Sequence, residues 1–128
     1  MAVYESCRSI TATAGESLTA GIYKFGIYDS SGNIVVQTTA QGAVAGIVGM
    51  NVASGGTFPL VVPDGGRAKV IAGATVAAGA KVATDTAGKA ITWVDAAGNN
   101  AVGHAVQSAV SGDVFAIQFS LVDIGGGS

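Results

Sequence analysis

Few side chains in this sequence are of the types that perform acid–base or nucleophilic chemistry, since it holds one histidine, one cysteine and eight acidic residues. Cys7 and His104 could form a thiol nucleophile and its base, because an imidazole can accept the proton of a nearby thiol. However, Cys7 lies in a predicted N-terminal arm, and His104 follows Gly103 as Ile47 follows Gly46 in an earlier, similar segment, which predicts an ordinary strand residue. No G-x-S-x-G elbow is present. We therefore expect no catalytic residue and predict that the protein is not an enzyme.

Metal and cofactor sites are not expected either. A single cysteine provides neither a disulfide nor a zinc ligand set. The later aspartates stand in or beside turn-like segments, where this side chain bonds its own backbone; they are Asp85, Asp95, Asp113 and Asp123. The spacing of a calcium loop is missing, and the glycine-rich stretches 54–56 and 64–67 lack the GK[ST] ending of a phosphate loop.

The composition excludes two classes of partner. Charged residues make up 11% of the 128 residues, against about 25% in average globular domains. The net charge is −2 and the six basic residues are scattered, which argues against nucleic-acid binding because that requires clustered cations. No apolar run approaches the roughly 18 residues of a membrane span, so we expect no membrane partner. So low a charge favours a surface of small-residue turns, or one covered by another protein copy.

The sequence contains an internal repeat. Residues 14–21 read AGESLTAG and residues 72–79 read AGATVAAG, 58 positions on, and each is followed by a strand-like run. We predict an arm at 1–10, one β domain at 11–123 with repeats at about 12–66 and 67–123, and a flexible tail or linker at 124–128. A repeat of this length is typical of one supersecondary unit duplicated around a shared core.

The pattern within the repeats predicts an all-β fold. In 114–122 the residues Phe115, Ile117, Phe119 and Leu121 alternate with small or polar residues, as in a half-buried strand. The equivalent run 57–62 contains Pro59, which predicts an edge strand or a proline nitrogen that faces outward. We expect a turn at 63–66 and a partner strand at 67–71. The predicted fold class is a small β-barrel or sandwich of two duplicated modules with pseudo-twofold symmetry, preceded by an extended N-terminal arm.

The repeated motif resembles one in the small capsid cement, or head decoration, proteins of tailed double-stranded DNA bacteriophages. In that family a strand, AGA-x-I-AAG, a second strand and D-x-x-GK-A follow one another, and here residues 68–90 read AKVIAGATVAAGAKVATDTAGKA. The likeness covers most of the chain, and the segments that carry it are 14–21, 29–36, 45–62, 68–92 and 102–121.

The resemblance implies a non-enzymatic virion protein without a cofactor. It would be made in the host bacterial cytoplasm and would bind the outer surface of the expanded capsid, which it stabilises against the pressure of packaged DNA. The implied partners are the major capsid protein and further copies of the chain, as a homotrimer. In this family the N-terminal arm often adds a strand to the capsid protein, so the expected capsid-binding residues are Ala2, Val3, Tyr4, Glu5 and Arg8.

An alternative function is a receptor- or glycan-binding β module of a phage fibre or adhesin. Such a module would need an exposed cluster of aromatic and polar side chains. Trp93 with Asp95, Asn99 and Asn100 is the candidate cluster.

Overall fold

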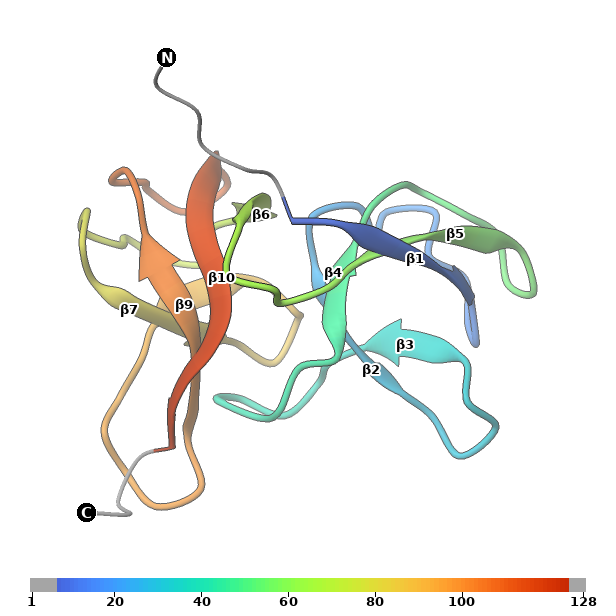
Figure 1. Ribbon diagram of the computed structural model, residues 1–128, viewed down its shortest axis with the longest axis horizontal. Coiled ribbons are helices and arrows are strands. Elements are labelled where there is room, and N and C mark those ends of the chain that lie inside the picture. The colour runs from blue at the N-terminus through green and yellow to red at the C-terminus, as the bar shows by residue number, and fades with distance from the viewer. Residues whose placement is uncertain (1–6, 125–128) are drawn as a thin grey trace.

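The computed structural model describes the backbone of residues 7–124 and the side chains of residues 7–120. Ten β-strands make up two lobes that lie side by side (Figure 1). The strands are β1 (Ser9–Thr13), β2 (Phe25–Tyr28), β3 (Ile34–Val36), β4 (Gly46–Val48), β5 (Thr57–Val61), β6 (Arg67–Ile71), β7 (Lys81–Thr84), β8 (Ala90–Thr92), β9 (Asn100–Ala105) and β10 (Val114–Ile124).

The two lobes are copies of one module, which confirms the predicted all-β class and duplication. Their antiparallel sheets have the orders β1-β5-β4-β2-β3 and β6-β10-β9-β7-β8, and the second order is the first with each strand advanced by five. A parallel bridge from Ala14 to Ile34 joins the chain after β1 to β3, at the opposite edge of the first sheet; Ala72 and Ala90 do the same in the second. Each module is therefore a small, partly closed barrel.

The repeated AG-x-x-h-x-AG segments supply the corners of each barrel. The Oδ1 atom of Asp29 accepts hydrogen bonds from the backbone N–H of Ser31 and Asn33, and Asp85 fixes the equivalent turn by accepting from Ala87 and Lys89. A Cβ at Gly15 would lie 2.4 Å from Asp29 Oδ2, and one at Gly73 would lie 2.2 Å from Asp85 Oδ2. Glycine is thus required where the corner passes over the aspartate turn, and Leu18 and Val76 are buried in the cores below.

The edge position, one of two alternatives predicted for the Pro59 strand, is wrong, and so is the predicted pairing of 67–71. β5 is an interior strand between β1 and β4, so Pro59 does not mark an edge. The Pro59 carbonyl accepts a hydrogen bond from Gly49 N at 2.9 Å, just past the end of β4. In addition, β6 pairs with β10 rather than with β5, because residues 63–66 carry the chain from one module to the other.

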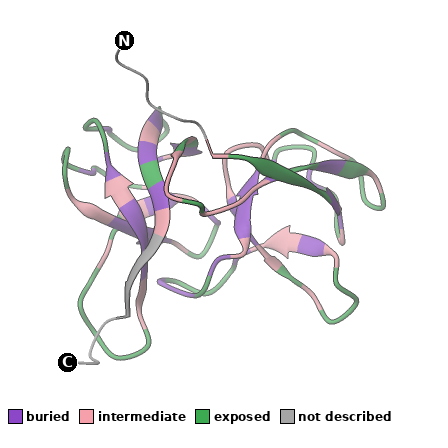
Figure 2. Ribbon diagram, viewed as in Figure 1, coloured by how far each residue is buried: buried purple, intermediate pink, exposed green. Residues whose placement is uncertain are grey.

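The contact between the modules lacks the predicted pseudo-twofold symmetry. Phe25 and Ile47, paired across β2 and β4, are almost fully buried in the core of the second module, where the Phe25 ring lies 6.1 Å from that of Phe119. The equivalent pair in the second module, Lys81 and His104, is partly exposed. β4 is buried along its whole length, whereas its equivalent β9 also contains half-buried residues (Figure 2). Equivalent faces of the two modules are thus buried differently, so the modules pack head to tail.

Gln41 connects the two modules through several hydrogen bonds. Gln41 is 7% exposed and has a φ of 60°, and its loop between β3 and β4 enters the second module. Its backbone N–H donates to Thr84 O at 2.7 Å and its carbonyl accepts from Asn100 N at 2.9 Å. Its side-chain Oε1 accepts from Val94 N at 3.0 Å and Nε2 lies 3.4 Å from Thr92 O. The corresponding turn of the second module places Gly98, with a φ of 82°, in the exposed loop after β8.

The predicted N-terminal arm overlaps the first sheet. Ser9 and Ile10 belong to β1, which occupies the place in its sheet that β6 occupies in the second. Residues 1–6 and 125–128, which include most of the predicted arm and tail, lie outside the described part of the chain. Between residues 7 and 124, no helix is long and apolar enough to cross a membrane.

Candidate functional site

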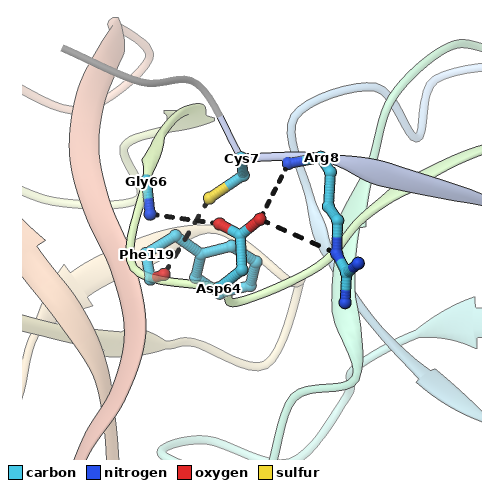
Figure 3. A network of polar contacts seen from close by, with 5 residues as sticks. All are labelled: Cys7, Arg8, Asp64, Gly66 and Phe119. Atoms are coloured by element: carbon cyan, nitrogen blue, oxygen red, sulfur yellow. Dashed lines mark hydrogen bonds and ion pairs between the residues drawn. The ribbon is translucent and has the colours of Figure 1, made fainter.

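The described chain begins at a small polar network that joins the N-terminal segment to the linker between the modules (Figure 3). Asp64, in that linker, accepts a hydrogen bond from the backbone N–H of Arg8 at 3.0 Å through Oδ2, and one from Gly66 N at 3.1 Å through Oδ1. The Arg8 carbonyl accepts from Val62 N at 3.0 Å, and Cys7 N donates to Arg67 O at 2.9 Å. Val62, Asp64 and Arg67 therefore hold the chain where it enters β1, and Gly66 in turn orients Asp64.

Arg8 is the one predicted capsid-binding residue within the described chain. Its side chain is 79% exposed, and its Nε lies 3.9 Å from Asp64 Oδ2, a long surface ion pair that contributes little to stability. The backbone of Arg8 is thus fixed while its guanidinium extends into solvent. Ala2, Val3, Tyr4 and Glu5 lie outside the described residues.

The network shifts the pKa of two groups in opposite directions. Hydrogen bonds from the Arg8 backbone, the Cys7 thiol and the Gly66 backbone hold the pKa of Asp64 below its usual value. Burial, followed by the nearby Asp64 carboxylate, raises the pKa of Cys7 to about 11. The thiol lies 3.9 Å from Phe119 O and packs against the second core. Cys7 is therefore a neutral structural residue near pH 7, not a nucleophile in a mobile arm.

His104 is a strand residue of the second module. It is a partly buried residue of β9, opposite Gln118 of β10 and Lys81 of β7, as the comparison with Ile47 predicted. Within residues 7–120, no three His, Cys, Asp or Glu side chains are grouped in a way that could hold a metal ion.

The alternative glycan-binding cluster is largely occupied by its own contacts. The indole N–H of Trp93 donates to Asn99 O at 3.3 Å, and the ammonium group of Lys81 lies 5.1 Å from the centre of the Trp93 ring. Asn99 Nδ2 donates to Val94 O, and Asn100 Nδ2 contacts the carbonyls of Gly98 and Gln41. These bonds shape the loop between β8 and β9, in which residues 94–98, including Asp95, are exposed.

Sequence reasoning overlooked Asp64 and Gln41, which carry the main polar contacts between segments. The sequence predicted only that Asp64 belongs to a turn. Its place after Pro63 in a Pro-Asp-Gly-Gly sequence is typical of an aspartate that bonds its own turn, as its bond with Gly66 shows. Gln41 gave no comparable signal, since its partners lie in the other module.

A solved structure shares this two-module fold. The crystal structure of the head fiber gp8.5 N base of bacteriophage phi29 matches with a TM-score of 0.71 and 20% sequence identity, over 90% of this chain and 97% of that chain. The chain is thus similar in fold, over nearly its whole length, to the base of a phage head fiber. No family model matches the sequence, and no curated protein matches it either.

Proposed function

We propose that this protein is a structural component of a tailed-phage head, which binds the outer surface of the expanded capsid and stabilises it against internal DNA pressure. The observation that carries the proposal is the shared fold with the head fiber base, which takes in both modules and 97% of that chain. The base of a fiber is the part that meets the surface carrying it, so a chain that consists almost entirely of this fold is suited to attachment.

The N-terminal segment is the proposed capsid contact. Residues Ala2–Glu5 come shortly before Cys7 and Arg8, whose backbones are hydrogen-bonded to β6 and to the linker. A partner that bound the N-terminal segment would therefore be connected to the contact between the modules. Strand addition by such a segment gives affinity through backbone hydrogen bonds. The exposed guanidinium of Arg8 would place a cation beside the added strand.

We also propose that the protein is a homotrimer that repeats the head-to-tail contact between copies. A heterologous contact leaves one unused surface at each end, and such contacts close into a ring when the rotation between copies returns to the start. The free surface of the second module carries Lys81 and His104, equivalent to the buried Phe25 and Ile47. The uncovered surface of the first module carries Tyr28, which is 52% exposed. The equivalent residue of the second module, Thr84, is fully buried and accepts a hydrogen bond from Gln41 N.

The test is co-sedimentation of the purified chain with expanded, undecorated heads, followed by heating of the particles. We expect saturable binding in multiples of three and heads that survive a higher temperature. Deletion of Ala2–Glu5 should weaken binding without lowering the melting temperature of the free protein, because the contacts of Cys7 and Arg8 remain. Deletion of 125–128 is the matched control and should have no effect. Lack of binding to expanded and unexpanded heads alike would refute the capsid role.

The trimer is tested separately by sedimentation velocity of the free protein and of the capsid-bound complex after cross-linking. Tyr28→Glu should weaken the trimer, because it places a charge in the proposed contact, whereas Thr75→Glu, at an exposed corner, should not. A trimer that is unaffected by Tyr28→Glu would refute the head-to-tail arrangement while leaving the capsid role intact.

A further inference from the structure

The linker between the modules contains a sequence that is prone to a covalent rearrangement. Asp64 and Gly65 form the one Asp-Gly pair in the sequence, which contains no Asn-Gly pair. In an Asp-Gly pair the backbone nitrogen of the glycine can attack the side-chain carbonyl carbon of the aspartate, because no Cβ on the glycine shields that nitrogen. Asp64 is exposed, so the water that completes the rearrangement can reach it.

The rearrangement releases one water and consumes one, and it needs no other reactant. The Gly65 nitrogen forms a bond to Asp64 Cγ, and the proton of that nitrogen leaves together with the hydroxyl of the protonated carboxyl group as water. Hydrolysis of the resulting succinimide ring at its Cα carbonyl gives isoaspartate, in which the main chain runs through Cγ. The first step therefore requires a protonated Asp64 and a Gly65 nitrogen that is free to give up its proton.

The folded chain restrains the nitrogen that would attack. Gly65 N donates a hydrogen bond to Phe119 O at 2.9 Å, and Phe119 N donates to Gly66 O at 2.9 Å. These two bonds connect the linker to β10. An attack on Cγ removes the proton that Phe119 O accepts, so the reaction cannot proceed without breaking the first bond.

The carboxyl group that would be attacked is restrained as well (Figure 3). Asp64 Oδ2 accepts a hydrogen bond from Arg8 N at 3.0 Å, and Oδ1 accepts one from Gly66 N at 3.1 Å. Hydrogen bonds of this kind favour the ionised carboxylate, and the bond from the Arg8 backbone is the main cause that holds the pKa of Asp64 below its usual value. The protonated form that reacts is therefore rarer than in an unfolded chain.

We propose that Asp64–Gly65 is a site of isoaspartate formation, which contacts from the start of β1 and from β10 keep slow in the folded protein. The restraints that come from outside the linker are Arg8 N and Phe119 O, whereas Gly66 N belongs to the linker itself. Displacement of the chain around Arg8 should therefore speed up the reaction. The product has one additional main-chain carbon in the linker. This inference does not depend on the proposed capsid role.

The test is incubation of the full chain at pH 7, digestion with trypsin and electron-transfer fragmentation of the peptide 25–67, which distinguishes isoaspartate from aspartate. The reference is the peptide acetyl-Leu-Val-Val-Pro-Asp-Gly-Gly-Arg-amide, which repeats residues 60–67 without the fold. Isoaspartate should form at residue 64 of the full chain at least about tenfold more slowly than in the peptide, because a local opening must come first. A rate equal to that of the peptide, or isoaspartate that forms first at another aspartate, would overturn the proposal.

Variants at residue 8 separate its backbone bond from its side chain. Arg8→Pro removes the N–H that Asp64 Oδ2 accepts and should raise the rate about fivefold, as the loss of one hydrogen bond predicts. Arg8→Ala is the matched control, because it keeps the N–H and removes only a guanidinium whose Nε lies 3.9 Å from the carboxylate. Its rate should stay within about twofold of the parent rate, as for the loss of a surface ion pair.

Equal rates for the two variants, or no isoaspartate at residue 64 in the parent and in Arg8→Pro while the peptide reacts, would overturn the proposal. The amide NMR spectrum of Arg8→Pro reports whether that variant retains the fold. If it does not, the comparison between the parent chain and the peptide decides alone.

Discussion

Replacement of Gln41 tests how the two modules are held together. Gln41→Ala removes the acceptor of Val94 N at 3.0 Å and the weaker donor to Thr92 O at 3.4 Å, but keeps both backbone bonds of residue 41. A hydrogen bond contributes about 0.5–1.5 kcal/mol net, and a buried group left without a partner costs about 1–3 kcal/mol. Because Val94 is exposed and can bond water, we expect a total loss of about 2 kcal/mol of unfolding free energy.

A second variant at the same position separates the side chain from the backbone. With a φ of 60°, residue 41 is in the left-handed region, which costs a residue with a Cβ about 1–2 kcal/mol. Gln41→Gly should therefore be more stable than Gln41→Ala by about 1 kcal/mol, although it lacks the same hydrogen bonds. The equivalent position in the second module is already glycine, at Gly98 with a φ of 82°.

The assay is equilibrium unfolding in urea, with Thr39→Ala in the same loop as the control for an exposed substitution, expected within about 0.5 kcal/mol of the parent chain. A loss below about 0.5 kcal/mol for Gln41→Ala would refute the bridging role of the side chain. A Gln41→Gly variant less stable than Gln41→Ala would refute the backbone argument. Two separate transitions for either variant would show that the modules unfold separately.

Three further predictions concern packing and protonation. Phe119→Ala should cost about 3–5 kcal/mol in the same assay, because the ring is fully buried against Phe25, and a cost under about 1 kcal/mol would contradict its place in the core. Gly73→Ala and Gly15→Ala should each cost about 1–3 kcal/mol by forcing aside the Asp85 or Asp29 turn, and a neutral effect at both would show that the turns yield without strain. Alkylation of Cys7 by iodoacetamide at pH 9 should be at least about tenfold slower than that of an unfolded peptide, because its pKa is raised to about 11. The shift makes the neutral thiol more stable in the folded state, so stability should fall as pH rises from 9 toward 11, and a level urea midpoint across that window would contradict it.

Most of the fold could be predicted because the signals that define it are local. The period-2 alternation of Phe115, Ile117 and Phe119 identifies β10, and all three side chains are buried. The Asp-x-x-Gly turns and the repeated corners follow from the conformational needs of glycine and aspartate. The prediction of strand pairing was wrong where pairing depends on topology. Nothing near residue 67 indicates that β6 pairs with β10, which begins 47 residues later, and not with β5.

The candidate site was less accessible to sequence reasoning. Arg8 was predicted to contact the capsid, but the residues that fix its backbone, Asp64 and Val62, lie in the linker more than fifty positions away. The thiol of Cys7 likewise becomes inert only through its placement between Phe119 and Asp64, which depends on how the modules pack.

The duplication itself contains the information that breaks its symmetry. Where the copies agree, as at Gly15 and Gly73, both modules need the residue for the same corner. Where they differ in polarity, the structure differs in burial: Phe25 becomes Lys81 and Ile47 becomes His104, and only the apolar member of each pair is covered. Gln41 and Gly98 differ in the same sense: at a φ above zero, the first module has a side chain that bonds Val94 of the second, and the second module has glycine. A twofold arrangement would have placed equal demands on both copies, so these three differences already favour a head-to-tail contact over the symmetric one.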